Sequence, residues 1–131
     1  MSFLSKLIID GKTYNVLECT YELNQSIDES GKPMGRPMGG QISLAIESDS
    51  DTDIFYWMKE PEQAKDGTIT FYKRDAMAQQ KMLQFTKGFC IHYKEQFIAD
   101  DEAPMVTSLI ISAEQIKLGS VDFKNLWGTV V

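Results

Sequence analysis

Two long stretches of this chain alternate apolar and polar residues with a period of two, and this pattern limits the chain to a β-rich fold. Within residues 81–98, one parity carries Leu83, Phe85, Phe89, Ile91, Tyr93 and Phe97. Residues 105–118 alternate in the same way until Ile116 and Leu118, which change parity. A period of two is that of a β-strand, because successive side chains point to opposite faces. We predict two long antiparallel strands joined by a turn at 99–104, with a bend or bulge at Gly88.

The rest of the chain adds shorter strands and one helix. Residues 3–25 are predicted to form a hairpin around a tight Asp10-Gly11-Lys12 turn, and residues 41–47 and 68–74 alternate as single strands. An acidic run over 48–53 offers N-cap residues for a short helix that ends at Pro61. About six to seven antiparallel strands with one short flanking α-helix predict a mainly β fold, a barrel or sandwich, forming a single domain over residues 1–131.

Two segments fit a lone barrel poorly. Residues 26–40 are predicted to be an extended loop without secondary structure, and loops of this length are uncommon unless they are functional or disordered. This loop repeats Lys32-Pro33-Met34-Gly35 as Arg36-Pro37-Met38-Gly39. The tail over 119–131 is more apolar than a disordered tail, because it carries Phe123, Leu126, Trp127, Val130 and Val131. Both segments are predicted to be surfaces that a partner covers.

Composition excludes several classes of function. Thirteen Lys and Arg against nineteen Asp and Glu give a formal net charge of −6, so the chain repels phosphate and a nucleic-acid partner is not expected. No apolar run approaches ~18 residues, so stable membrane insertion is not expected. The first ten residues hold only short apolar pieces, and no cleaved signal peptide is predicted. We expect synthesis in the cytosol.

The residue types that carry chemistry are few and scattered. Cys19 and Cys90 sit among alternating apolar residues, which favours two reduced, buried or half-buried thiols over a disulfide or a reactive thiol. The single histidine, His92, lies on the polar parity, which favours a solvent-facing residue over a catalytic base. Gly39-Gly40 opens a strand rather than the helix that a phosphate-binding loop needs. We predict no catalytic, cofactor-binding or metal site.

One acidic motif has a calcium-binding alternative. Positions 1, 3, 5 and 12 of an EF-hand loop would fall on Asp49, Asp51, Asp53 and Glu60. Position 6 would be Ile54, however, where the sharp turn of that loop requires glycine. Capping of the helix is therefore the favoured interpretation of this run.

Several short segments, taken in order, resemble one family. They are the Met-Ser-Phe start, the Asp10-Gly11-Lys12 turn with Tyr14-Asn15-Val16-Leu17, Gly39-Gly40, the helix over 51–58, Gly67-Thr68-Ile69 into Lys73-Arg74-Asp75, and the strand over 110–116. Their order and spacing resemble the Bacteroidetes branch of the type VI secretion tube proteins, called Hcp (haemolysin-coregulated protein) or TssD. The resemblance covers essentially the whole chain.

The resemblance implies a structural role rather than an enzyme. Proteins of this family fold as a β-barrel with a flanking helix and form hexameric rings, which stack into a tube inside a contractile sheath. The sheath drives the tube outward with a spike protein and effectors, so export through this apparatus is implied. The family's loop between the second and third strands contacts neighbouring subunits or rings. The implied interface, together with the apolar tail, comprises Lys32, Pro33, Met34, Gly35, Arg36, Pro37, Met38, Gly39, Gly40, Phe123, Leu126 and Trp127.

Two other classes stay open at this point. A phage-type tail tube protein shares the fold and stacks similarly, and the acidic charge does not separate it from a secretion tube. A monomeric barrel of lipocalin type, which binds a small molecule, would need an apolar cavity inside a closed up-and-down barrel. The interrupting helix and the long Gly/Pro segment disfavour this last alternative.

Overall fold

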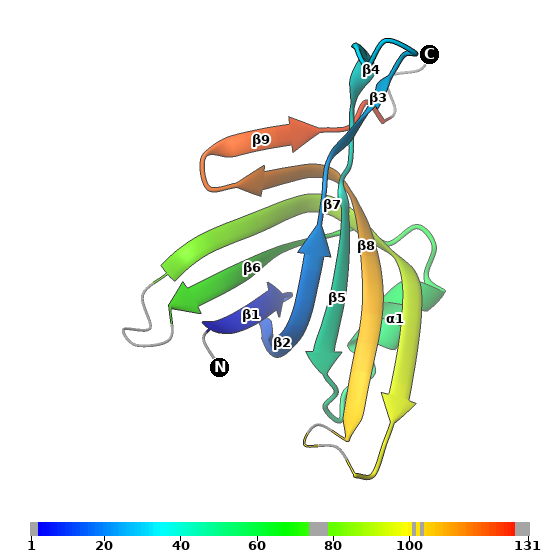
Figure 1. The fold of residues 1–131 in the computed structure, drawn as a ribbon. Helices are drawn as coiled ribbons and strands as arrows, with labels where there is room; N and C mark the ends of the chain where they lie inside the picture. Colours follow the sequence, from blue (N-terminus) through cyan, green and yellow to red (C-terminus); the bar gives the residue numbers. More distant parts are fainter. Residues whose placement is uncertain (1–2, 74–78, 101, 103, 128–131) are drawn as a thin grey trace.

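The computed structural model describes residues 3–73, 79–100, 102 and 104–127. Within them the chain forms nine strands and one helix (Figure 1), namely β1 (Phe3–Ile9), β2 (Lys12–Tyr21), β3 (Asn24–Ile27), β4 (Pro33–Met38), β5 (Gln41–Glu47), α1 (Asp53–Lys59), β6 (Lys65–Lys73), β7 (Gln79–Phe97), β8 (Met105–Leu118) and β9 (Val121–Lys124). The two long strands, the strand over 41–47 and the helix lie where the sequence predicts them.

Six strands close into an antiparallel barrel. Their hydrogen-bonded order is β5-β2-β1-β6-β7-β8, and β8 pairs again with β5, so that the sheet meets itself. The short strand β9 adds to β8 beyond β5, with Phe123 opposite Ile116. Closure is one way in which all-β domains remove exposed sheet edges. The predicted mainly β fold with one short flanking helix is confirmed.

The hairpin predicted over residues 3–25 has the expected turn but ends sooner. Asp10 and Gly11 both have positive φ, 54° and 78°, the conformation of a two-residue type I′ turn. β2 ends at Tyr21, and the chain then leaves the barrel. β3 and β4 form a separate two-stranded sheet. The expectation of a loop without secondary structure over 26–40 is therefore wrong, because the prolines occupy an edge strand, where a missing N–H removes no barrel hydrogen bond.

The long strands bend together at a bulge next to Gly88, as predicted. Lys65 pairs with Gly88 but Gly67 pairs with Phe85, so β7 holds one extra residue there, and Lys87 has a positive φ of 58°. The buried parity of β7 changes across this bulge, since Phe85 is buried before it and Gly88 after it. The paired strand β8 changes with it, and this explains the parity break at Ile116 noted in the sequence. Figure 1 shows both strands arching over the barrel.

A second bulge in β7 means that alternation alone does not predict which of its side chains point into the barrel. The register with β8 shifts between Cys90 and His92, which leaves Ile91 unpaired in the register. Cys90 is buried, whereas Ile91 and Phe97 are 47% and 64% exposed. A single inward face from Leu83 to Phe97 is therefore wrong, because each bulge reverses the side to which the following side chains point.

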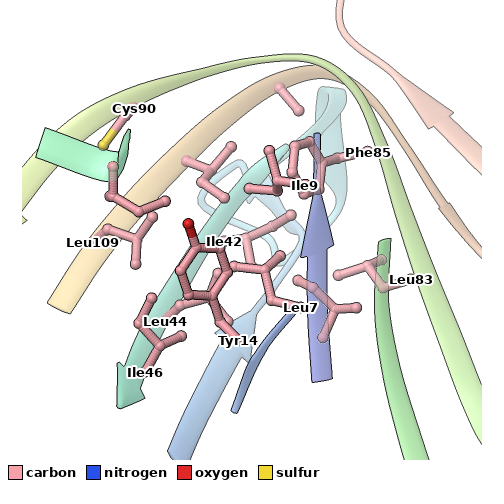
Figure 2. Packing of buried hydrophobic residues seen from close by; sticks show 14 of the residues in the cluster. Leu7, Ile9, Tyr14, Ile42, Leu44, Ile46, Leu83, Phe85, Cys90 and Leu109 are labelled. Atoms are coloured by element: carbon pink, nitrogen blue, oxygen red, sulfur yellow. The ribbon is translucent and has the colours of Figure 1, made fainter. Parts of the chain in front are cut away.

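Apolar side chains from all six barrel strands fill the interior. The buried residues include Leu7, Ile9, Tyr14, Ile42, Leu44, Ile46, Ile69, Leu83, Phe85, Cys90, Leu109 and Ile111. Figure 2 shows side chains from β1, β2, β5, β7 and β8 converging on one another. Ile42, Leu44 and Ile46 point inward as their alternation predicts. The volume that a lipocalin-type barrel would reserve for a ligand is occupied by the protein's own side chains.

The helix α1 packs against the barrel through two residues. Ile54 and Trp57 are buried in the main cluster, and the Trp57 indole N–H donates to the Gln63 carbonyl at 2.8 Å. On the outer side, the rings of Phe55 and Tyr93 pack edge to face, and their centroids are 5.4 Å apart. A helix this short is held by packing rather than by its own propensity.

The acidic run before α1 binds a lysine and also supplies a side-chain acceptor to the helix, because the Asp51 carboxylate accepts a hydrogen bond at 3.0 Å from the N–H of Asp53, the first residue of α1. The N-cap residue is Thr52, and its side chain makes no capping hydrogen bond. Asp51 also pairs with the Lys12 ammonium at 2.6 Å, and Asp53 lies 3.2 Å from the same nitrogen. These acceptors raise the pKa of Lys12. Partial burial works against ionisation of Asp51, but the Lys12 contact and the Asp53 N–H outweigh it, and the pKa of Asp51 lies below its usual value.

We predict that Trp57→Ala lowers the free energy of unfolding by about 3–5 kcal/mol, because it empties a fully buried site and removes the bond to Gln63. Tyr56→Ala is the control on the same helix, since Tyr56 is 54% exposed, and its loss should be at most about 1 kcal/mol. Urea unfolding followed by far-UV circular dichroism measures both. Equal losses would show that α1 is not anchored through Trp57.

We predict that Asp51→Asn destabilises the protein at pH 7 and has no effect in acid. A carboxylate with a depressed pKa in the folded state contributes stability above its unfolded pKa, and this contribution disappears as the pH falls through the folded value. Because Lys12 is partly exposed, the loss at pH 7 should stay within about 1 kcal/mol. Urea titrations at pH 7 and near pH 3 test this, and a loss that is the same at both pH values would contradict it.

Candidate assembly surfaces

The β3–β4 hairpin, called the arm from here on (residues 24–38), projects from one end of the barrel (Figure 1). Both strands are exposed along their whole length, and neither pairs with a barrel strand. The Asp28 carboxylate holds the turn by accepting bonds from the Ser30 hydroxyl at 2.8 Å and the Lys32 N–H at 3.0 Å. The Ser30 hydroxyl and backbone N–H donors lower the pKa of Asp28. The arm is therefore a structured element.

Most of the predicted interface residues lie along this arm. Lys32 follows the turn, and Pro33, Met34, Gly35, Arg36, Pro37 and Met38 follow it on β4. Three large apolar side chains stay open to solvent there, with Ile27 62%, Met34 53% and Met38 62% exposed. A cluster of exposed large apolar residues on a projecting element is typical of a surface that a protein partner covers.

One residue of the arm turns back toward its own barrel. The Arg36 guanidinium donates to the carbonyl of Lys124 on β9 at 2.8 Å. Its central carbon also lies 5.9 Å from the centroid of the Phe123 ring, within the range of a cation–π contact. Arg36 therefore differs from its neighbours on the arm, because its charged group already has partners within the subunit.

The two glycines at the foot of the arm pass close to another segment. The Asn125 side-chain N–H₂ donates to the carbonyls of Gly39 and Ala113, both at 3.1 Å, while the Ala113 N–H donates to the Gly40 carbonyl at 2.8 Å. Gly40 has a φ of +95°, and a Cβ there would lie 2.4 Å from the Asn125 nitrogen. Glycine is required at this position by both the backbone conformation and the available space.

Part of the predicted apolar tail over 119–131 is a strand of the main sheet. β9 belongs to the main sheet, and Phe123 is half-buried against the core. Trp127 is half-buried, and the centroid of its ring lies 5.9 Å from the centroid of the Phe89 ring. Leu126, in contrast, is 63% exposed. Val130 and Val131 lie outside the described residues. Phe123 and Trp127 thus pack against the subunit itself.

An apolar groove of about 550 Å³ lies between the foot of the arm and β9. Its lining includes Leu23, Pro37, Leu118, Val121 and Phe123. This groove is not among the surfaces that the sequence predicts, although the sequence carries one signal for it. Leu23 continues the apolar parity of β2 past the last paired residue, Tyr21, so its side chain has no barrel interior to enter.

The chemistry-bearing residues are dispersed through the fold. Cys19 is half-buried and Cys90 buried, both are free thiols as predicted, and burial raises the pKa of Cys19 to about 11. His92 is exposed, also as predicted. Within the described ranges, no three His, Cys, Asp or Glu residues are placed to hold a metal ion. The described helix is too short to cross a membrane.

A closed barrel with a filled interior, a flanking helix and a projecting arm with exposed apolar side chains is typical of a subunit that assembles with other proteins. The class that these features indicate is a structural, assembling subunit. The sequence matches the family model of hemolysin coregulated protein Hcp (TssD) over residues 1–128. The chain belongs to this family and is a secretion-system tube subunit.

Solved structures agree with this assignment. Hcp1 from Flavobacterium johnsoniae is 39% identical, with a TM-score of 0.89 and coverage of 93% of this chain and 99% of that one. Hcp1 from Salmonella typhimurium is 13% identical at a TM-score of 0.75, covering 94% and 92%. The sheath–tube complex of an extracellular contractile injection system, PVC, shares the fold at 17% identity and a TM-score of 0.54, covering 89% and 88%. No curated protein sequence matches the chain.

We predict that Gly40→Ala destabilises the subunit more than Gly11→Ala does. Both glycines have positive φ, so both substitutions add backbone strain of about 1–3 kcal/mol. Only at Gly40 does the new methyl group also meet Asn125 and the Ala113 carbonyl, whereas Gly11 has open space. Urea unfolding of both variants isolates the cost of this contact, and equal losses would contradict the close packing at the foot of the arm.

Proposed function

We propose that this chain is the structural subunit of the inner tube of a type VI secretion apparatus, in which six copies form a ring and rings stack into a tube. The observation that carries the proposal is the similarity to Flavobacterium johnsoniae Hcp1 over 93% of this chain. The role proposed is structural rather than catalytic, which agrees with the dispersed placement of the cysteines and His92.

The arm supports a role in contacts between copies. Ile27, Met34 and Met38 expose apolar surface that the subunit does not cover, and a two-stranded hairpin standing alone is marginally stable in water. Contact with a neighbouring copy would bury those side chains and stabilise the hairpin. We assign this contact to ring stacking, because the arm extends beyond one end of the barrel (Figure 1).

The proposed ring contact involves the groove beside β9. In a ring each subunit presents two different surfaces, so that a heterologous contact closes by rotation. β9 pairs only with β8 among the described strands and leaves its other edge for a neighbour. Val121, 70% exposed, and Leu23, 52% exposed, add apolar surface next to that edge.

The remaining partners follow from the tube role. The PVC structure is a sheath–tube complex, and we propose that the stacked rings of this chain lie within a contractile sheath, below a spike protein. Secreted effectors would travel with the tube. On this proposal the chain is made in the cytoplasm and leaves through the apparatus, without a cleaved signal peptide.

Molar mass and particle shape test the proposal directly. Light scattering of the purified chain should give six times the 14.9 kDa subunit mass, and negative-stain images of the same peak should show rings. A monomer that retains a small molecule through purification would contradict the proposal and favour a ligand-binding barrel.

We predict that replacing residues 24–38 by Asn-Gly leaves the barrel folded and abolishes stacking. Tyr21 pairs directly with Ile42, so a short turn can join β2 to β5 without the arm. Far-UV circular dichroism and urea unfolding check the fold, and electron microscopy at increasing protein concentration checks stacking. Tyr56→Ala, on α1 at the side of the barrel, is the control that should stack normally. Tubes formed without the arm would remove it from this role.

A further inference from the structure

We propose that Arg36 and Asn125 form a latch that fixes the direction of the arm before subunits meet, so that these two residues position the stacking surface without contacting the partner. This inference rests on the proposed role of the arm in stacking. It reassigns Arg36, which the sequence places among the contact residues, to a positioning role within its own subunit.

The arm needs such a device because the barrel does not hold it. β3 and β4 pair only with each other among the described strands, not with a barrel strand, and all of their residues are exposed. At its foot lie Gly39 and Gly40, the residue type with the greatest backbone freedom. An arm that swings about such a hinge loses conformational entropy when it docks, and this loss weakens the contact.

Arg36 ties the arm above this hinge. Its guanidinium reaches the Lys124 carbonyl and lies near the Phe123 ring, and both of these residues belong to β9. β9 in turn is paired with β8 in the main sheet, and Phe123 packs on the core. The bond therefore links an element outside the barrel to a strand of the main sheet, across 88 positions of sequence.

Asn125 ties the hinge itself. Both acceptors of its side-chain N–H₂ are carbonyls, one on Gly39 at the hinge and one on Ala113 of β8. Its own N–H donates to the Glu114 carbonyl at 2.7 Å, which holds Asn125 against β8. A carboxylate of the same shape could not donate to either carbonyl, so only the amide serves this function.

The experiment compares Arg36→Met and Asn125→Asp with Lys32→Met in the full chain. Lys32→Met removes one positive charge from the same arm, and no hydrogen bond or ion pair of the Lys32 side chain is described in the structure. Hydrogen exchange measured by mass spectrometry reports the latch. Exchange over residues 36–42 and 121–125 should rise about fivefold for each hydrogen bond lost in the first two variants and stay unchanged in the third.

Assembly supplies the second readout. The mass of the ring should not change in Arg36→Met, whereas the protein concentration needed for stacking should rise about fivefold. Arg36→Lys keeps the charge and one donor but lacks the planar group, so it should recover part of the effect. Exchange that is equal in Arg36→Met, Asn125→Asp and Lys32→Met would overturn the latch, as would a stacking concentration in Arg36→Met equal to that of the unmodified chain.

The two proposals fail in different ways. If the unmodified chain forms no rings or tubes, the proposed function is wrong, and hydrogen exchange on whatever species it forms still tests the latch. If the unmodified chain stacks and the latch variants exchange and stack as it does, the tube role stands and the positioning role of Arg36 and Asn125 is wrong.

Discussion

The pairing of β7 with β8 sets both the closure of the barrel and the position of β9. These two strands are the longest, and they bend together at the bulge beside Gly88. Because of that bend, one part of β8 meets β5 and closes the barrel, while the part beyond it pairs with β9. The closed barrel buries the core. β9 provides the groups that contact Arg36, and Asn125, directly after β9, contacts the foot of the arm. Barrel closure and arm placement therefore share one cause.

The subunit combines a rigid body with a projecting element whose apolar side chains lack a covering layer. In a protein that acts alone, exposing Ile27, Met34 and Met38 would invite aggregation. On the proposed stacking role, contact with a neighbouring copy would bury the same side chains. The proposed latch of Arg36 and Asn125 would hold the arm in one direction, so that it would meet a partner of defined geometry instead of any apolar surface nearby.

Much of the fold was predictable because strands carry a local signal. The inward alternation of Ile42, Leu44 and Ile46 and the Asp10-Gly11 turn depend on neighbours in sequence. The arm is not predictable from the sequence as a hairpin. Its Pro and Gly residues disfavour a central strand, and they do not distinguish a loop from an edge strand outside the barrel. The contact between Arg36 and Lys124 had no local signal, because it joins residues that only the closed sheet brings together.

Periodicity, turn chemistry and the order of short segments are readable along the chain, and they suffice for the mainly β class, the long strand pair, the position of the helix and the family. Which strands meet, where Phe123 and Trp127 pack, and how the arm is held follow only from the folded barrel. The reason is that each bulge reverses the side of the sheet to which the following side chains point. One extra residue in β7 therefore changes which of its side chains are buried and which residues of the neighbouring strand they face. Contacts of that kind exist only once the barrel has closed.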